Sequence, residues 1–125
     1  MNVLSKKNKI NKMQKKIFAI DIDNTICTTK GSDYENSKPI KSIIKILNKL
    51  KKNGHIIKLF TSRHMKKCNG DVKTINKKYK HITCKQLRSW GLDFDELIMG
   101  KPVYDIIVDD KMLSIKDLKK FFKKI

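Results

Sequence analysis

Four aspartates fall in two short clusters, each placed directly after a run of apolar residues. Asp21 and Asp23 follow the first run, and Asp109 with Asp110 follows another one far along the chain. Two carboxylates at positions i and i+2 repel each other unless a cation or a shared proton relieves the repulsion. Oxygen ligands of this kind suit a hard cation such as Mg²⁺. The two clusters therefore predict a magnesium site if the fold brings them together, although one aspartate at a strand end is often only a turn former or a helix cap.

The elements that must position these acids follow from the spacing of the apolar residues. Short apolar runs predict strands at 17–21, 56–60, 97–99 and 105–108, and helical periodicity predicts helices over 39–53, 80–90 and 114–122. The first strand is expected to be buried and parallel, Pro39 to lie in the first turn of its helix, and Asn53-Gly54 to end that helix. Ser114 and Asp117 resemble a capping box, and residues 28–37 and 64–77 are expected to be loops.

The order of these elements predicts an α/β fold built on an open and mostly parallel sheet. Ligands of such sheets bind beyond the carboxyl ends of the strands. The aspartates and Thr61, which follows the second strand, are expected at that edge. Arg63 and His64 come shortly after Thr61 and are close enough to reach a bound substrate, although both are also ordinary loop residues.

The length and composition predict one folded domain in a reducing environment. The chain has 125 residues, of which 39% are hydrophobic, enough for a single core. Residues 1–16 are basic and lack a clear period, which indicates a flexible extension before a domain at 17–125. The sequence contains no apolar run near 20 residues and no secretory leader, so we expect a soluble, cytoplasmic protein. The three cysteines are widely spaced and odd in number, which favours free thiols.

The formal net charge of +18 has two interpretations. Lysines that neutralise phosphates release counterions, so a strongly basic chain can bind nucleic acid. However, Arg63 and Arg88 are the only arginines in the sequence, and nucleic-acid readers favour arginine for its bidentate fork. Lys, Asn and Ile share A/T-rich codons, so a compositional bias explains the charge equally simply, and we favour that explanation.

The ordered set of polar residues resembles the haloacid dehalogenase (HAD) superfamily of phosphohydrolases. The four motifs of that family are an Asp-x-Asp-x-Thr sequence, a Thr or Ser ending the next sheet strand, a lysine, and an acidic pair after an apolar strand. The matching residues in chain order are Asp21, Asp23 and Thr25, then Thr61, then Lys101 in Gly100-Lys101-Pro102, then Asp109 and Asp110. The resemblance spans about residues 17–125. One departure is Asn24, where many members carry glycine; asparagine tolerates the unusual backbone angles of such a turn.

The resemblance implies a fold and a mechanism. The fold would be a HAD-like Rossmannoid three-layer structure with a minimal cap. Asp21 would attack phosphorus to give an aspartyl-phosphate, and Asp23 would protonate the leaving group and then deprotonate water. Thr61 and Lys101 would hold the phosphoryl oxygens, and Thr25 would support the loop.

The metal site and the nature of the substrate follow from the same resemblance. Mg²⁺ would bind the Asp21 carboxylate, the Asp23 carbonyl and Asp109, with Asp110 nearby. A narrower likeness is to small capsule or polysaccharide biosynthesis phosphatases, through residues 31–34, 86–91 and 95–102, which would imply a phosphorylated sugar or a similar metabolite. The chain has room for a cap only in residues 27–38 and 63–78, so the site is either open or completed by a second subunit of a homo-oligomer. A phosphatase of polynucleotide ends or nucleotides, and a basic nucleic-acid-binding module without catalysis, remain as alternatives.

Overall fold

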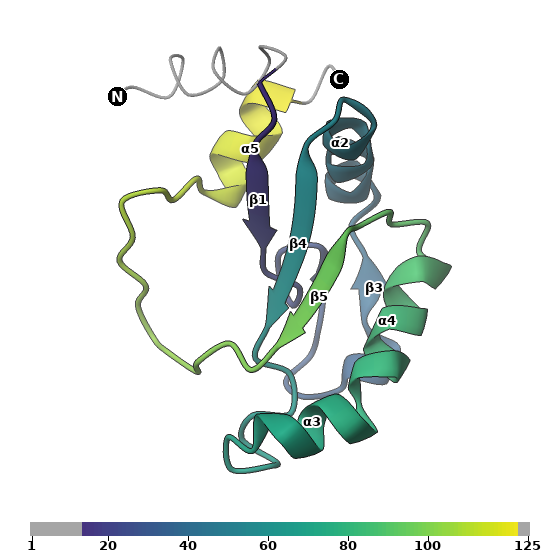
Figure 1. Ribbon diagram of the computed structural model, residues 1–125, viewed down its shortest axis with the longest axis vertical. Helices are drawn as coiled ribbons and strands as arrows, with labels where there is room; N and C mark the ends of the chain where they lie inside the picture. Colours follow the sequence, from purple (N-terminus) through teal and green to yellow (C-terminus); the bar gives the residue numbers. More distant parts are fainter. Residues whose placement is uncertain (1–13, 123–125) are drawn as a thin grey trace.

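The centre of the molecule is a three-stranded parallel sheet, seen in the computed structural model, which describes residues 14–122. Its strands are β1 (Ile17–Ile20), β4 (Ile56–Thr61) and β5 (Glu96–Met99), in the order β1-β4-β5. Ile20 pairs with Leu59, and Thr61 pairs with Met99. All three strands run in one direction in Figure 1, so their carboxyl ends share one edge of the sheet. The chain therefore has an α/β, Rossmann-like fold, and the sequence-based strand positions at 17–21, 56–60 and 97–99 are confirmed.

The middle strand, β4, shows why this sequence forms a sheet. Ile57 and Leu59 are fully buried and Thr61 is 1% exposed, whereas the residues between them are only partly covered. This alternation has the period of two that a strand requires. The buried side chains of β4 form part of the core cluster.

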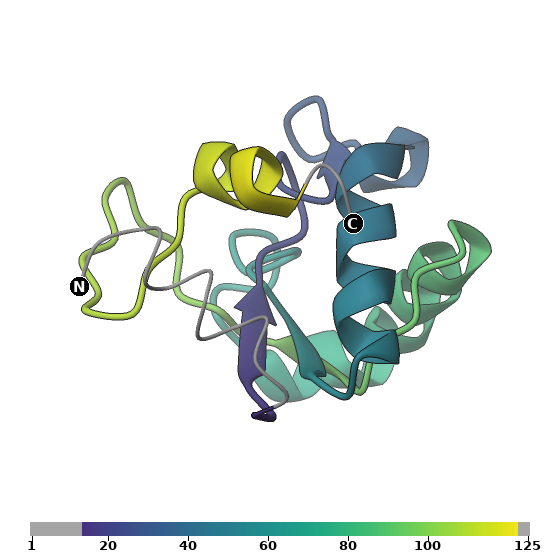
Figure 2. The same ribbon diagram turned by 90° about the horizontal axis from the view of Figure 1, so that it is seen from above.

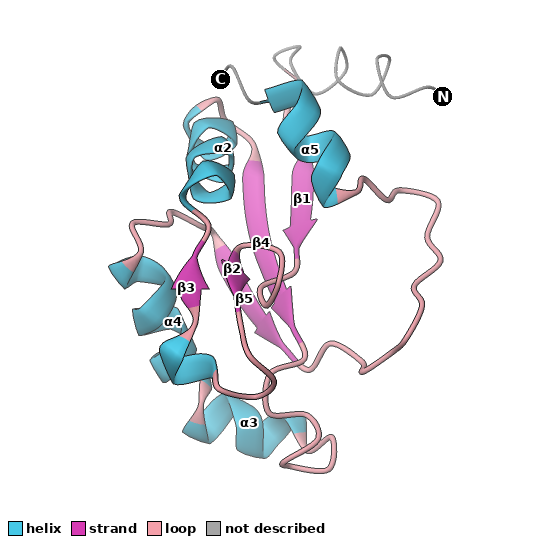
Figure 3. Ribbon diagram, turned by 180° about the vertical axis from the view of Figure 1, so that it is seen from behind, coloured by secondary structure: helices cyan, strands magenta, loops and turns pink. Residues whose placement is uncertain are grey.

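One face of the sheet is covered by α2 (Lys41–Lys52) and α5 (Ile115–Phe122), which contact each other. Figures 2 and 3 show the two helices side by side on that face. The buried residues of α2 recur at helical spacing: Ile43, Ile44, Ile46, Leu47 and Leu50. The helix ends at Lys52 with Asn53 as its C-cap, and Gly54 follows with φ +95°, as the sequence predicts. Within residues 14–122, no helix combines the length and the apolar character that crossing a membrane would need.

The start of α5 also confirms a prediction. The backbone N–H of Asp117 donates a hydrogen bond of 3.1 Å to Ser114 Oγ, as in the first half of a capping box. The start of α2 differs from the prediction, because Pro39 lies outside the first turn. Pro39 belongs to the short strand β3 (Lys38–Pro39), which pairs with β2 (Cys27–Thr28), and the helix begins after Ile40.

The expected loop at 64–77 contains a helix in its second half. This helix, α3 (Val72–Lys78), is followed by α4 (Lys80–Ser89), and both contact β5. Asp71 caps α3, since its carboxylate accepts hydrogen bonds from the N–H and the hydroxyl of Thr74. Within α3 only Ile75 is buried, so the apolar period was too short to detect in the sequence. The expected loop at 28–37 contains one turn of 3₁₀ helix, η1 (Tyr34–Asn36).

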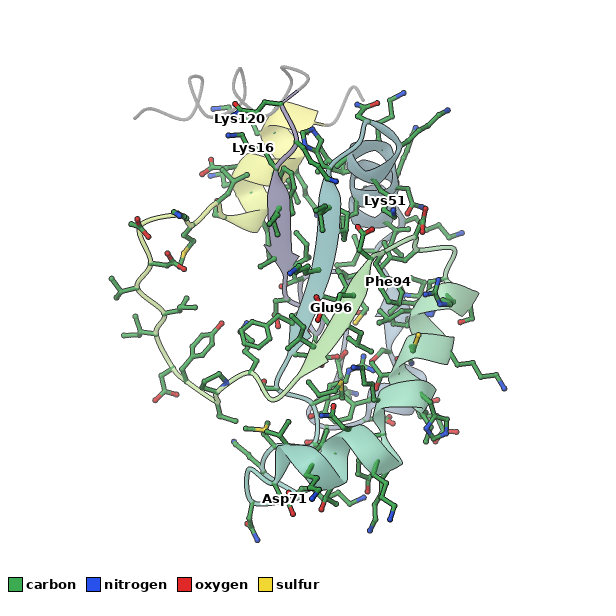
Figure 4. All side chains as sticks on the ribbon, in the orientation of Figure 1. Lys16, Lys51, Asp71, Phe94, Glu96 and Lys120 are labelled. Atoms are coloured by element: carbon green, nitrogen blue, oxygen red, sulfur yellow. The ribbon has the colours of Figure 1, made fainter. Side chains whose placement is uncertain are left out.

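The fold begins slightly earlier than the sequence indicated. Residues 1–13 of the expected extension lie outside the described residues. Lys16, also assigned to that extension, already forms backbone hydrogen bonds with the fold: its carbonyl accepts from Ile56 N at 2.9 Å and its N–H donates to His55 Nδ1 at 3.1 Å. In Figure 4, Lys16, Lys51 and Lys120 lie at the end of the molecule where the strands start, and Asp71 lies at the opposite end.

The largest departure from the predicted fold is the fourth strand, at 105–108, which is absent from the structure. These residues belong to a long loop that leaves the end of β5 and passes outside β1 (Figure 1). Ile106 is 83% exposed and Val108 is 92% exposed. A strand needs a neighbouring edge that bonds its N–H and C=O groups, and a local apolar run does not supply one.

The missing strand also changes the environment of β1. Among the described residues, β1 pairs with β4 alone, so it is an edge strand with Ile17 64% exposed. The prediction that β1 is buried is therefore wrong for the conformation described here.

Candidate active site

Asp21, just beyond the end of β1, lies against a lysine that comes from the end of β5. Its Oδ1 accepts a 3.2 Å hydrogen bond from Lys101 Nζ, and its Oδ2 accepts one of 3.0 Å from Thr25 Oγ1. The Asp21 side chain remains 36% exposed, whereas the Lys101 side chain is 10% exposed. A partly open carboxylate thus faces a nearly buried ammonium group, and both lie at the carboxyl edge of the sheet.

The backbone around Lys101 fixes its position. Its N–H donates a 3.0 Å hydrogen bond to the Thr61 carbonyl, which joins the ends of β4 and β5. The preceding Gly100 has φ +94°, and a Cβ there would lie 2.8 Å from Val72 Cγ2. Both the conformation and the close approach of α3 therefore require glycine at this position.

The charge of Lys101 is stabilised at this site. Burial alone would lower the pKa of the Lys101 ammonium, but its interactions with Tyr104 and the Asp21 carboxylate outweigh burial and raise the pKa above its ordinary value of 10.5. The ammonium also lies 5.0 Å from the centre of the Tyr104 ring. Lys101 is therefore a fixed positive charge beside Asp21 at neutral pH.

Asp23 is held by Arg63 rather than standing open beside Asp21. Arg63 Nη2 lies 2.9 Å from Asp23 Oδ1, and Arg63 Nε lies 2.9 Å from Asp23 Oδ2. The Arg63 side chain is only 2% exposed and that of Asp23 is 21% exposed. The structure thus places Arg63, expected from the sequence to bind substrate, in a bidentate pair with the second aspartate.

Two further residues complete the surroundings of Arg63. Its Nη1 donates a 2.6 Å hydrogen bond to Gln86 Oε1, and Gln86 Nε2 donates one of 2.7 Å to the Tyr34 carbonyl. The guanidinium carbon lies 4.8 Å from the centre of the Tyr34 ring. Sequence reasoning assigned Gln86 no role. Its position in α4 could have indicated a role, because a polar residue next to the buried Leu87 and one turn after the buried Thr83 needs a hydrogen-bond partner.

Thr61 is buried at the end of β4, where the sequence placed it. Its side chain is fixed by a hydrogen bond in which the Arg63 N–H donates to Thr61 Oγ1 at 3.1 Å. The Thr61 hydroxyl retains its own proton for donation, because in this contact the oxygen only accepts. Thr61 therefore links the other two residues: its hydroxyl accepts from the Arg63 N–H, and its carbonyl accepts from the Lys101 N–H.

The turn that follows Asp23 depends on the backbone conformation of Asn24. Asn24 has φ +60°, the left-handed conformation that asparagine accepts more readily than most residues. Its Oδ1 accepts a 3.1 Å hydrogen bond from the Thr29 N–H, and the Ile26 N–H donates to the Ile22 carbonyl at 2.8 Å. Asparagine therefore serves this turn in place of glycine, as the sequence indicated.

His64 lies in a group of aromatic rings next to Arg63. Its ring stacks on Tyr79 at 3.9 Å between centroids and meets the edge of Tyr34 at 4.9 Å. Burial, and then the nearby charges of Arg63 and Lys67, lower the pKa of His64 below its ordinary 6.5 despite the opposing charge of Asp23. His64 is thus a wall residue of the site that favours the neutral form.

Asp109 and Asp110 are not brought to the other acids. Both are exposed in the long loop, and Asp109 Oδ1 accepts a 3.0 Å hydrogen bond from the Lys111 N–H. That backbone bond, then a hydrogen bond with Asp110, lowers the pKa of the Asp109 carboxyl. Among residues 14–122, no three His, Cys, Asp or Glu side chains lie close enough to hold a metal ion. The expected ligand set of Asp21, Asp23, Asp109 and Asp110 is therefore not assembled in this conformation.

Comparison with known proteins supports the fold and gives no information on the function. No protein-family model matches the sequence, and no curated protein matches it. The chain is similar to the crystal structure of a structural-genomics target from Vibrio cholerae, with 26% sequence identity and a TM-score of 0.73. The similarity covers 89% of this chain and 98% of that one, so the α/β architecture is shared over nearly the full length of both.

Proposed function

We propose that this protein is a phosphohydrolase whose nucleophile is Asp21. The observation that carries the proposal is the Asp21–Lys101 contact at the carboxyl edge of the sheet, where the Lys101 backbone is bonded to the Thr61 carbonyl. A carboxylate attacking an anionic phosphate needs positive charge and hydrogen-bond donors fixed in advance, because positioning and charge neutralisation dominate phosphoryl transfer. The ordered resemblance to the HAD superfamily supports the same assignment.

In the proposed reaction, an Asp21 oxygen forms a bond to phosphorus while the bond from phosphorus to the leaving oxygen breaks. Asp23 gives its proton to that leaving oxygen. Asp23 then takes a proton from water as the water attacks the aspartyl-phosphate, which releases inorganic phosphate and restores Asp21. Lys101 and Thr61 hold the phosphoryl oxygens in both steps.

A divalent cation is part of the proposal, but its ligand set is incomplete in the described conformation. Asp21 has a partly exposed carboxylate and Asp23 offers a backbone carbonyl, which are hard oxygen ligands. A third acid is lacking near them among the described residues. When bound, Mg²⁺ would reduce the repulsion between the carboxylate nucleophile and the phosphate.

The third acid is supplied, we propose, when residues 105–108 dock along the free edge of β1. The segment exposes apolar side chains, and β1 offers unpaired backbone groups on the side past which the loop runs. Docking would bury these apolar side chains and pair the free backbone groups of β1. It would also move Asp109 and Asp110 to the edge of the sheet where Asp21 lies. Substrate and cation would favour the docked form because they bind it better than the open one.

The proposed substrate is a phosphorylated sugar or a metabolite of similar size. The aromatic rings of Tyr34, His64 and Tyr79, next to the Asp23–Arg63 pair, offer apolar contact to a ring on the leaving-group side. The small hairpin β2–β3 and the turn before α3 are the segments left to act as a minimal cap, and a second subunit of a homo-oligomer would close the site further.

A direct experiment measures phosphate release from a panel of sugar phosphates and of 3′- and 5′-phosphorylated oligonucleotides, with and without Mg²⁺. We expect Mg²⁺-dependent turnover of sugar phosphates, and its loss in Asp21→Asn, which keeps the size of the side chain and removes the nucleophile. Asp117→Asn, in the first turn of α5, is the matched control and should keep full activity. Turnover that persists in Asp21→Asn would refute the proposal.

The panel also separates the proposal from its alternatives. A preference for oligonucleotides that disappears at higher salt would replace the sugar-phosphate assignment with a nucleic-acid-end phosphatase, because the salt dependence reports counterion release. Salt-sensitive binding of nucleic acid that Asp21→Asn leaves intact, without phosphate release by the wild-type protein, would indicate a binding module.

A further inference from the structure

Arg63 is a buried cation, and each nitrogen of its guanidinium group donates to a group of the protein. Three sets of partners surround it: the Asp23 carboxylate, the Gln86 amide oxygen and the Ser37 hydroxyl, with Nη2 3.5 Å from Ser37 Oγ. The Tyr34 ring covers one face of the guanidinium at 4.8 Å. Isolated charges are costly to bury, so the arginine is stable here because these partners replace water. Most of the N–H donors of Arg63 are therefore directed at protein groups rather than at a substrate phosphate.

The two carboxylate oxygens of Asp23 differ in the number of hydrogen-bond donors that they face. Oδ1 accepts from Thr29 Oγ1 at 2.6 Å, from Arg63 Nη2 at 2.9 Å and from the Cys27 thiol at 3.7 Å, and it shares the Arg63 Nε hydrogen at 3.2 Å. Oδ2 accepts from Arg63 Nε at 2.9 Å. The lone pairs of Oδ1 are therefore occupied by protein donors. Oδ2, which has fewer donors, is the oxygen left available to a bound substrate.

The partners of Arg63 also fix its own orientation. Gln86 comes from α4 and bonds both Arg63 and the Tyr34 carbonyl, so it joins that helix to η1. The Thr29 hydroxyl, the other donor to Asp23, also bonds the hydroxyl of Ser37, the residue that follows η1, at 2.7 Å. The position of the Asp23 carboxylate is therefore determined from two sides, by Arg63 and by Thr29.

We infer that Arg63 is a positioning residue for Asp23, which it holds with Oδ2 left available to the leaving oxygen, and that Gln86 supports Arg63 in this role. The inference rests on the proposed phosphohydrolase function and assigns Arg63 to proton transfer rather than to substrate binding. Lysine cannot replace it, because an ammonium group lacks the planar fork that binds a carboxylate on two sides.

The test compares Arg63→Lys with the wild-type protein on two phosphate esters that differ in the need for a general acid. An alkyl phosphate has a poor leaving group that must be protonated, whereas 2,4-dinitrophenyl phosphate has a good one that leaves as an anion. The comparison uses kcat/KM, which reports the steps up to formation of the aspartyl-phosphate, because hydrolysis of that intermediate also needs Asp23 and is common to both esters. General acid catalysis contributes about 10²- to 10⁴-fold, so we expect kcat/KM for the alkyl ester to fall by roughly 30- to 1000-fold. For the dinitrophenyl ester, which needs no general acid, kcat/KM should change by less than about 3-fold.

Two further variants keep the test decisive. Gln86→Leu removes the support of Arg63 without touching the ion pair, and it should show the same selective loss at smaller size. Arg88→Lys is the matched control, since Arg88 lies on the exposed face of α4 with its guanidinium 4.5 Å from the centre of the Phe94 ring. It should leave both esters unaffected, and thermal unfolding curves should confirm that all three variants are folded.

The outcomes separate this inference from the proposed function. Equal losses of kcat/KM on the two esters would overturn the positioning role and return Arg63 to phosphate binding. If Arg63→Lys does not fold, Gln86→Leu alone decides by the same comparison. An inactive wild-type protein, or an active Asp21→Asn variant, would instead remove the function on which the inference rests.

Discussion

Lys101 reaches Asp21 across 80 residues of sequence, with Nζ 3.2 Å from Oδ1. Three constraints place the lysine there: the hydrogen bond from its N–H to the Thr61 carbonyl, the conformation of Gly100, and the burial of its own side chain. The sequence contains many lysines, and Lys101 differs from an ordinary surface lysine in its contact with Asp21 and in its burial. The pair joins the first and last strands of the sheet at the edge where ligands bind.

Replacing Lys101 by Met should reduce catalysis strongly. Methionine fills a similar volume and removes the charge that opposes the phosphoryl oxygens, so we expect kcat to fall by about 10²- to 10³-fold, the loss typical of one preorganised donor. Steady-state kinetics on the best sugar phosphate would measure it. Lys58→Met is the control, because Lys58 pairs with Glu96 at 3.4 Å on the surface of β4 and β5. A loss of similar size in both variants would contradict the role of Lys101.

Gly100→Ala should destabilise the protein more than Gly54→Ala. The two glycines have nearly equal φ angles, +94° and +95°, but a Cβ on Gly100 would lie 2.8 Å from Val72 Cγ2 while a Cβ on Gly54 would meet nothing within 4 Å. The difference between the variants therefore measures the steric contact alone. We expect Gly54→Ala to lower the free energy of unfolding by about 1–2 kcal/mol. Gly100→Ala should lower it by roughly a further 1–3 kcal/mol.

Urea unfolding of both variants would test this difference. Adding Val72→Ala to Gly100→Ala should recover part of the extra loss, since it removes the atom that the new Cβ meets. Equal unfolding free energies for the two single variants would contradict the prediction, because they would show that α3 moves away from the added methyl group without a loss of stability.

His64 should make the fold sensitive to mild acid. Because the native pKa lies below the ordinary 6.5, the unfolded chain binds a proton that the native chain does not, over the range between the two values. The contribution of His64 to stability is therefore complete above pH 6.5 and is lost as the pH falls from 6.5 towards the native pKa. Unfolding free energies measured in urea at several pH values below 6.5 should decrease accordingly.

The variant His64→Asn should make that decrease shallower. Asparagine tolerates the φ of +69° found at this position and does not titrate in this range. His81→Asn, which removes an exposed histidine of α4, should leave the slope unchanged. If His64→Asn and His81→Asn have the same effect on the slope, the acid sensitivity comes from elsewhere in the chain.

Charging the exposed segment at 105–108 should abolish activity without unfolding the protein. Ile106 and Val108 are 83% and 92% exposed, so replacing both with Asp should change the free energy of unfolding by less than about 0.5 kcal/mol per site. The same changes would oppose docking along β1, and phosphate release should be lost. Ile82→Asp, at an isoleucine of α4 that is 56% exposed, is the control and should stay active.

Hydrogen exchange gives an independent measurement of docking. With Mg²⁺ and a substrate analogue, amides of β1 and of residues 105–108 should exchange more slowly in the wild-type protein, because new backbone hydrogen bonds protect them. The doubly charged variant should show no such slowing. Unchanged exchange in the wild-type protein would argue against docking.

The helices and strands with their own periodic signal could be predicted from the sequence. Strand β4 alternates buried and exposed residues, and α2 repeats its isoleucines and leucines at helical spacing, so local pattern and tertiary environment agree. Helix α3 could not be predicted in the same way, because its stability depends on one buried isoleucine and on the Asp71 cap. The apolar run at 105–108 gave the opposite error: its composition is that of a strand, but pairing depends on a partner edge.

The sequence by itself determined which residue types stand at the ends of the strands: Asp21 and Asp23, Thr61, and Lys101. It also determined the turn at Asn24, since few residues accept that conformation. Only the tertiary structure decided that Lys101 faces Asp21, that Arg63 is committed to Asp23 through a pair that Gln86 supports, and that Asp109 and Asp110 lie apart from them. The physical reason is that hydrogen bonds and ion pairs depend on distance and direction in space, and residues separated by tens of positions carry no local signal of either.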